Sequence, residues 1–284
     1  KKLRAIAHFR LADFYPSMAL RLGLHDSTCG LNMGETAELL AREFAISRED
    51  QDRFALHSHQ RAVAAENDLA KEIEPSYAKD SKNLLHAVES DVGPREKQSE
   101  KALGRLRPVF QKNGSVTAGN SSQITDGAVA ILLATEAACN LHGLNPLGQV
   151  RGYCYAGCEP KRMGLGPAYA IAKATKDLGC CLEDIDLVEI NEAFAAQVLA
   201  VQKALDSSRF CRERLDLPYP LGSIPSEKLN VNGGAIALGH PVGASGTRLA
   251  LSALKELRRR NERQGLVTLC VGGGQGGALW LEAA

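Results

Sequence analysis

The second half of the chain alternates strand patterns with helix patterns, and this alternation most constrains the fold. The patterns predict strands over residues 148–158, 186–190, 265–271 and 277–282, helices over 167–178, 192–205 and 244–260, and a loop over 206–228. Strands separated by helices of this length are typical of layered domains in which helices cover the faces of a sheet. We therefore expect an α/β fold.

The first half is predicted to be helical before a further pair of strands. One helix is expected over residues 35–44, and a second starts at Ser47, which forms a capping arrangement with Asp50. Residues 76–107 are polar and charged, so a long excursion is expected there. Apolar residues then predict buried strands, and a short helix should follow. These elements are expected over residues 115–118 and 127–134 for the strands and from Thr135 to Gly143 for the helix.

Charge and composition exclude several classes of protein. A net charge of +1 over 284 residues provides no general field for nucleic acid or a membrane surface. No apolar run of about 18 residues is present, so no membrane span is expected. The eight cysteines form no compact disulfide framework and lack the paired spacing of a zinc site. We expect a reduced intracellular compartment and no metal.

A glycine-rich stretch around one histidine is the strongest candidate for a functional site. Residues 230–246 contain five glycines that flank His240. Glycine lets backbone approach a ligand closely or adopt positive φ. The stretch would suit a small carbonyl group held against the imidazole, although glycine-rich turns between a strand and a helix are also common.

Two further segments place polar side chains at predicted strand ends. Asn191 opens the sequence NEAFAAQ after one strand, where it could also be a helix N-cap. Cys270 opens the sequence CVGGGQGG after another strand. A cysteine on a buried strand is commonly a small inert hydrophobe.

The three segments, in this order, resemble the NEAF, GHP and CxG segments of the thiolase family, which comprises acetyl-CoA acetyltransferases and 3-ketoacyl-CoA thiolases. The resemblance extends from about Gly30 to Ala284. It implies a thiolase-like layered fold, in which a βαβαββ half is repeated and a helical loop domain is inserted in the first half. On this resemblance, residues 1–112 are the loop domain, residues 113–145 the closing strands and helix of the amino-terminal half, and residues 146–284 the complete carboxyl-terminal half.

The resemblance also implies an activity and a set of catalytic residues. The family cleaves 3-ketoacyl-CoA with CoA, or condenses acetyl-CoA in the reverse Claisen reaction, through a cysteine thioester. His240 would activate the nucleophilic cysteine and donate to a thioester oxygen, and Asn191 would hold a water in the same oxyanion hole. Cys270 would exchange the substrate proton, and the N–H of Gly272 would join a second oxyanion hole.

Four other residues match positions that contact the substrate in the family. Ser122 matches the loop that contacts the pantetheine of CoA, and Phe194 would line the acyl or pantetheine channel. Met33 and Met163 match two methionines of the acyl pocket, although methionine is also common core filler. Asn32 stands where short-chain members have a histidine, which favours longer acyl chains.

The family's nucleophilic cysteine lies in the beginning of the first half, which we expect before Lys1. Cys29 falls in the loop-domain match, so we do not assign it that role. The chain as given is therefore expected to be an inactive fragment of an acyltransferase of fatty acid metabolism. The alternative is a non-catalytic CoA-binding or assembly piece of a thiolase-like protein. A ketoacyl synthase ranks lower, because those enzymes have a second histidine at the position of Cys270.

The resemblance implies CoA thioesters as substrates and no separate cofactor. It implies a homodimer or homotetramer, with a β-oxidation hydratase or dehydrogenase as a further partner. The cytoplasm is the expected location, with the mitochondrial or peroxisomal matrix as alternatives.

Overall fold

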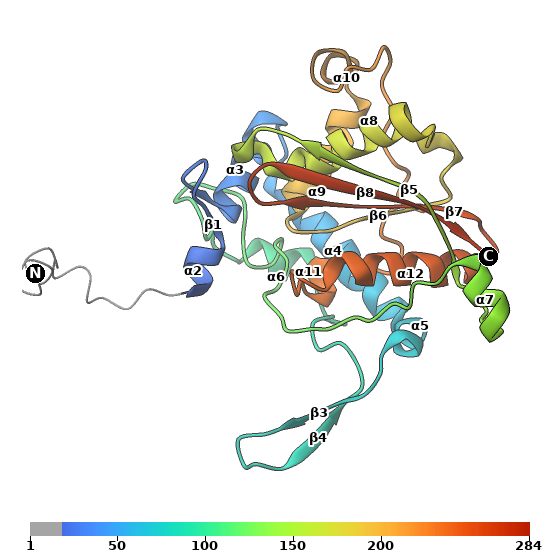
Figure 1. The fold of residues 1–284 in the computed structure, drawn as a ribbon. Helices are drawn as coiled ribbons and strands as arrows, with labels where there is room; N and C mark the ends of the chain where they lie inside the picture. The colour runs from blue at the N-terminus through green and yellow to red at the C-terminus, as the bar shows by residue number, and fades with distance from the viewer. Residues whose placement is uncertain (1–18) are drawn as a thin grey trace, which may run out of the picture.

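The structure is a computed structural model that describes residues 19–284. The first residues of the predicted loop domain, 1–18, lie outside this range. In the described part of the chain, a mixed sheet forms the centre, and helices from both halves of the sequence surround it (Figure 1).

The central sheet consists of β5 (Gly148–Gly157), β6 (Leu187–Ile190), β7 (Gln264–Val271) and β8 (Gln275–Ala283). Their order in space is β5-β8-β7-β6, in which β6 and β7 are parallel and the other pairs are antiparallel. With α8 (Gly166–Leu178) after β5 and further helices after β6, the strands follow the order βαβαββ. The α/β prediction is confirmed.

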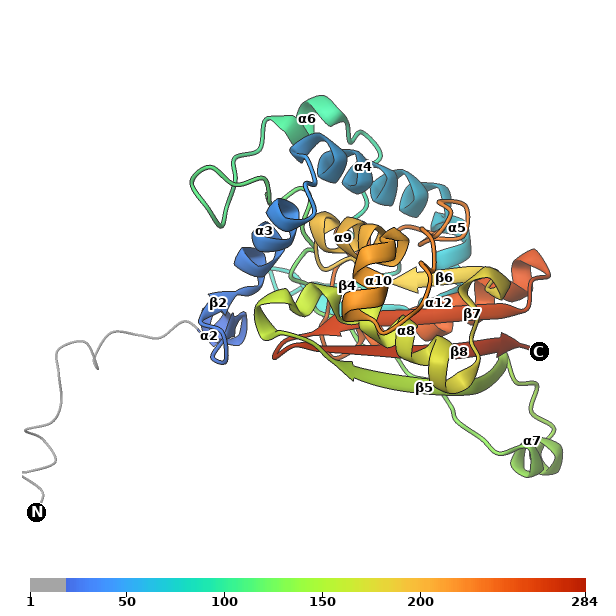
Figure 2. The same ribbon diagram turned by 90° about the horizontal axis from the view of Figure 1, so that it is seen from above.

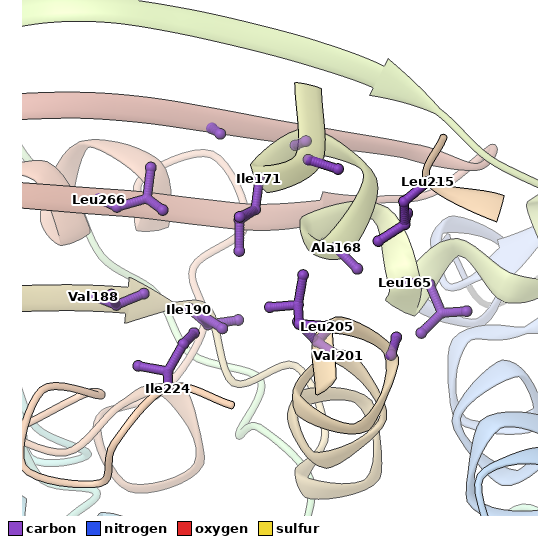
Figure 3. Close-up of a cluster of buried hydrophobic side chains, with 14 of the residues drawn as sticks. Leu165, Ala168, Ile171, Val188, Ile190, Val201, Leu205, Leu215, Ile224 and Leu266 are labelled. Carbon is purple, nitrogen blue, oxygen red and sulfur yellow. The ribbon is translucent and has the colours of Figure 1, made fainter. Parts of the chain in front are cut away.

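One face of the sheet is covered by α8 and α9 (Ala195–Asp206), as Figures 1 and 2 show. The buried side chains between them form the largest apolar cluster, which includes Ile171 of α8, Val188 of β6 and Leu205 of α9 (Figure 3). Each buried Val, Leu or Ile side chain contributes about 1.5–3 kcal/mol relative to exposure. This cluster therefore fixes β6, from whose end the candidate site starts.

The opposite face of the sheet is covered by α12 (Ser245–Arg260). Its apolar residues recur at helical spacing, and Leu249, Ala253 and Leu257 pack against Leu187 of β6 and Val267 of β7. Arginines fill the last turn, where they complement the helix dipole. The helix therefore starts at the glycine-rich stretch and follows the sheet towards its far end.

The amino-terminal helices begin where side chains cap them. Asn32 and Glu35 form a complete capping box at the start of α3 (Met33–Glu43). Ser47 caps α4 (Arg48–Ala64) by accepting from Asp50 N–H, as the sequence predicted. Thr135 likewise caps α7 (Glu136–His142), which ends at the left-handed Gly143.

Shorter elements connect these parts. They are the helices α2 (Ala19–Gly23), α5 (Glu66–Leu69), α6 (Glu100–Gly104), α10 (Ser208–Arg214) and α11 (Ala235–Leu238), the 3₁₀ turns η2 (Ala70–Glu72), η3 (Pro160–Leu165) and η4 (Leu182–Asp184), and the strand pairs β1 (His25–Asp26) with β2 (Leu31–Asn32) and β3 (Ser76–Lys79) with β4 (Leu85–Val88). No helix of residues 19–284 is long and apolar enough to cross a membrane.

The strands predicted over residues 115–118 and 127–134 are wrong. Residues 127–134 form no strand, and residues 115–118 pair only through the isolated bridge from Thr117 to Pro108 and the bond from Val109 N–H to the Val116 carbonyl. A strand needs a neighbour for its backbone hydrogen bonds, and in residues 19–284 no strand lies beside 127–134. Leu132 and Leu133 are 79% and 81% exposed, so this apolar run was wrongly interpreted as buried.

Three smaller predictions also differ from the structure. The excursion at 76–107 contains the β3–β4 hairpin, whose residues are all exposed, and the loop predicted over 206–228 contains α10. The helix predicted from residue 192 starts at Ala195, because Phe194 has extended backbone angles (φ −147°, ψ 145°). Residues 191–194 thus precede the helix, with a bend at Ala193, whose N–H donates to the Asn191 carbonyl at 3.1 Å.

Candidate active site

The site starts where two parallel strands end side by side. Ile190, the last residue of β6, lies opposite Thr268 of β7, and the N–H of Asn191 donates to the Thr268 carbonyl at 3.0 Å. Cys270 follows two residues further along β7. Asn191 and Cys270 therefore lie at the same end of the sheet, where the carboxyl ends of two parallel strands meet. Ligand sites of α/β proteins lie at this end.

Asn191 reaches the histidine of the glycine-rich stretch. Its Nδ2 lies 3.4 Å from Nε2 of His240, which follows α11. The N-cap interpretation of Asn191 is wrong, because α9 has Phe194 at its N-cap and no side chain caps it. The amide is thus available to the site.

The backbone around His240 is held by residues 123–125. Its N–H donates to the Gln123 carbonyl at 3.0 Å. The preceding Gly239 has φ 96°, and a Cβ there would lie 2.4 Å from Oγ1 of Thr125. Only glycine fits this positive φ and close approach, which explains one glycine of the predicted motif.

The other ring nitrogen of His240 contacts Ser245, a residue that the sequence analysis did not identify. His240 Nδ1 lies 2.6 Å from Ser245 Oγ, in the first turn of α12. Burial, and secondarily the nearby Arg248 guanidinium, lower the pKa of His240 below its ordinary value. The imidazole is therefore neutral at pH 7 and can accept a proton.

Cys270 is a buried thiol in an apolar cluster. Burial raises its pKa to about 12, so it is protonated at pH 7. Three predicted substrate residues, Met33, Met163 and Phe194, pack in the same cluster. The structure thus brings the predicted acyl-pocket residues together around the predicted acid/base thiol.

The glycine loop after Cys270 presents its backbone to this cluster. A Cβ added to Gly272 would lie 3.9 Å from the sulfur of Met33. Within residues 19–284 the Gly272 N–H makes no hydrogen bond, whereas the next N–H, that of Gly273, donates to Asp26 Oδ2 at 2.9 Å. Asp26 was not identified from the sequence, because only the fold brings it there.

Ser122 lies beside the segment that follows Asn191. Its N–H donates to the Ala193 carbonyl at 2.9 Å, and the neighbouring Ser121 bridges to Phe194. The position suits a contact with a substrate that enters past Phe194, and the pantetheine role stays a prediction.

Glu192 links α4, the segment after β6 and the glycine-rich stretch through hydrogen bonds. Its buried carboxylate accepts from Ser58 Oγ of α4 at 2.6 Å, from Asn230 Nδ2 at 2.9 Å and from the N–H of Ile236 at 3.2 Å. From the sequence, Glu192 is expected to be a structural residue beside Asn191, and these contacts agree with that role.

An open depression of about 420 Å³ adjoins His240, between residues 125–129 and 241–244. It does not include Cys270 or Asn191, so it extends the site on the side of Pro241. A cavity of about 580 Å³ lies elsewhere, between the end of α3 and α10. No group of three or more His, Cys, Asp or Glu side chains in residues 19–284 could hold a metal ion.

The fold and the site define a layered α/β protein that joins an asparagine, a histidine and a buried thiol at one end of its sheet. The family model described as "Thiolase, C-terminal domain" matches residues 144–283, and the model described as "Thiolase, N-terminal domain" matches residues 4–137. The chain belongs to the thiolase family.

Curated relatives and solved structures agree with this assignment. The chain is 45% identical over 262 residues to an acetyl-CoA acetyltransferase of Chromobacterium violaceum, covering 92% of this chain and 62% of the relative. It is 44% identical to the mitochondrial 3-ketoacyl-CoA thiolase of Mus musculus, with the same shares covered, 92% and 62%. The crystal structure of human mitochondrial 3-ketoacyl-CoA thiolase superposes with a TM-score of 0.84 and 40% identity over 97% of this chain and 68% of that one. The chain thus spans 62% of the length of these two curated relatives.

Proposed function

We propose that the protein containing this chain transfers acyl groups between CoA thioesters, by thiolysis of 3-ketoacyl-CoA or by the reverse Claisen condensation of acetyl-CoA. The contact between Asn191 and His240, at the sheet edge where the buried Cys270 lies, carries this proposal. It joins three segments that lie far apart in the sequence.

The charge states of the two groups support complementary roles. The neutral imidazole of His240 can take the proton of a nucleophilic thiol, and the protonated Cys270 can give a proton to a carbanion or a leaving thiolate. The unpaired N–H of Gly272 and the Asn191–His240 pair would each stabilise a developing oxyanion.

The nucleophile is proposed to lie in a part of the protein other than residues 19–284. Cys270 is the only cysteine of the described residues in the cluster with Met33 and Phe194, and its raised pKa makes it a weak nucleophile. The same observation favours the alternative, in which the chain alone binds CoA without catalysis.

We also propose a substrate range and an assembly for the protein. Met33, Met163 and Phe194 would enclose the acyl chain, and Asn32 favours longer chains. Asn32 caps α3, and the next residue, Met33, packs against that cluster. We propose CoA and acyl-CoA as the ligands, a homodimer or homotetramer, a hydratase or dehydrogenase of β-oxidation as a partner, and the cytoplasm or a mitochondrial or peroxisomal matrix as the location.

Two forms of the protein test the function. The 284-residue chain, and the chain with the coding sequence that precedes Lys1 in its gene, would each be incubated with acetoacetyl-CoA and CoA. We expect turnover, at about 1 s⁻¹ or more, only from the longer form, and its loss in His240→Ala. An acetyl adduct on the shorter chain would instead identify a nucleophile within it, which Cys29→Ala and Cys270→Ala would locate. A longer form that binds CoA but never turns over would favour the non-catalytic alternative.

A further inference from the structure

Ser245 is a buried hydroxyl with two partners on the loop that carries the histidine. Its side chain is fully buried at the start of α12. Its Oγ lies 2.6 Å from Nδ1 of His240 and 3.2 Å from the carbonyl oxygen of Pro241. The oxygen therefore stands between the imidazole and a carbonyl group that can only accept.

A hydroxyl has a single proton, so Ser245 Oγ can donate to only one of its two partners. When Ser245 Oγ–H donates to the Pro241 carbonyl, Oγ is left to accept from Nδ1–H of His240. On the other side of the ring, the Asn191 Nδ2 can only donate, so Nε2 accepts. Both sides of the ring thus require the same tautomer, with the proton on Nδ1 and a lone pair on Nε2.

The opposite tautomer would break contacts on both sides. A proton on Nε2 would face the NH₂ group of Asn191. If the amide turned over, Oδ1, which is buried without a partner in residues 19–284, would accept from Nε2–H and Nδ2 would lose its contact with the ring. The Ser245 hydroxyl would have to turn to Nδ1 and leave the Pro241 carbonyl. The Pro241 carbonyl would keep the N–H groups of Ala244 and Ser245 as donors, so the opposite tautomer loses the Ser245 Oγ–H bond and leaves no carbonyl unpaired. One hydrogen bond is worth about 0.5–1.5 kcal/mol, and this difference disfavours that tautomer.

We propose that Ser245 is a positioning residue that holds the His240 proton on Nδ1, so that Nε2 faces the site as a base. Ser245 touches no reacting atom and acts only through the imidazole. Its purpose rests on the proposed function, since a base at Nε2 is what activation of a thiol needs. The tautomer itself follows from the contacts alone.

The test is the ¹⁵N spectrum of histidine in the labelled 284-residue chain at a pH where His240 is neutral. The chain has seven histidines, and the signals of His240 are assigned as the set that is missing from the spectrum of His240→Gln. We expect a protonated-type shift at Nδ1 and an unprotonated-type shift at Nε2 of His240. In Ser245→Ala the Nδ1–H loses its acceptor, and both shifts should move towards a mixture of tautomers, whereas Ser245→Thr, which keeps the hydroxyl, should restore them.

Ser252→Ala is the matched control. It removes another buried hydroxyl of α12, whose Oγ donates to Glu72 at 2.6 Å and does not contact His240, so it should leave the His240 shifts unchanged. A wild-type spectrum with the proton on Nε2 overturns the proposal even if Ser245→Ala fails to fold. Shifts in Ser245→Ala identical to wild type overturn it as well.

Turnover separates this inference from the function. If the longer form is active, Ser245→Ala should lower kcat by about 10–100-fold, as for partners that orient metal-bound histidines, with KM little changed. If no form is active but the tautomer behaves as expected, the proposed function fails and the positioning role of Ser245 stands.

Discussion

Asp26 and Gly273 lie 247 residues apart in the sequence and are joined by a hydrogen bond from the glycine N–H to the Asp26 carboxylate at 2.9 Å. The same carboxylate also accepts from Thr28 N–H at 2.7 Å. The β1–β2 hairpin is thereby attached to the glycine loop that contains Gly272, the proposed oxyanion donor. A residue outside the three motifs thus sets the position of a backbone donor.

Asp26→Ala should impair catalysis more than binding in an active form of the protein. Without the carboxylate, the loop at Gly272 is free to move, and removing an oxyanion donor typically costs about 10²–10³-fold in kcat. We expect a loss up to that size with KM little changed, measured by steady-state thiolysis. Asp80→Asn, at a carboxylate of the exposed β3–β4 turn, is the control and should retain activity.

The Asp26 carboxylate should also make stability depend on acid pH. Its hydrogen bonds with Thr28 hold its pKa below the ordinary value, and the Gly273 N–H adds to this. A carboxyl whose pKa is lowered by folding stabilises the protein above its unfolded pKa, and this stabilisation is lost as pH falls through the folded pKa. Urea unfolding between pH 7 and pH 3 should show a smaller decline in Asp26→Asn than in the wild type; equal declines would contradict the idea.

Cys270→Ala should separate the two halves of the proposed reaction. In an active form of the protein, acylation of the nucleophile should continue, while proton exchange at the α-carbon of acetyl-CoA stops. Loss of a general acid/base typically costs about 10²–10⁴-fold. Mass spectrometry of the acyl-enzyme and deuterium exchange of acetyl-CoA measure the two steps, and rapid condensation by Cys270→Ala would refute the role.

Glu189→Gln should stabilise the protein, and more so at higher pH. Burial raises the pKa of Glu189 on β6 to about 8, although Arg248 opposes the shift. A carboxyl whose pKa is raised by folding contributes stability below its unfolded pKa, which is lost as pH rises through the folded pKa. The neutral amide avoids this loss, so Tm should rise at pH 8 by about 2–4 °C per kcal/mol recovered and change little at pH 4. A lower Tm at pH 8 would show that the ionised carboxylate is stabilising.

Glu192→Ala should destabilise the fold through its three donors. The substitution removes the acceptor of the Ile236 N–H, of the Ser58 hydroxyl hydrogen and of one Asn230 amide hydrogen. Asn230 Nδ2 still donates to the Ile190 carbonyl, and Ser58 Oγ still accepts from the Gly234 N–H. Each buried unpaired group costs about 1–3 kcal/mol, so we expect a loss of about 3 kcal/mol or more in denaturant unfolding. Glu227→Ala, at an exposed carboxylate, should change stability by less than about 0.5 kcal/mol.

Local signals predicted the parts of the fold that depend on local interactions. The cap of α4 was predicted because Ser47 acts on a residue three positions away, and the start of the α7 helix at Thr135 was predicted from the same kind of local signal. The structure of residues 127–134 was not predicted correctly, since apolar residues indicate only that a segment can be buried. The β3–β4 hairpin escaped prediction because it buries neither face.

The residues of the candidate site likewise include some that local motifs identify and some whose roles depend on the fold. His240, Asn191 and Cys270 were identified because each stands in a short motif. Ser245 and Glu192 lie within or beside those motifs, but their roles depend on contacts that the sequence does not display. Glu192, for example, meets Ser58, which is 134 residues away.

The position of β8 in the sheet has a consequence for folding during synthesis. β5 is made first, yet its only neighbour in the described chain is β8, with Gly148 opposite Ala283 near the carboxyl end. β8 also separates β5 from β7. The sheet therefore cannot close until β8 has left the ribosome, and pairings this distant form slowly. Deletion of β8 (Gln275–Ala283) would remove a central strand, so a chain that lacks it should not form this sheet.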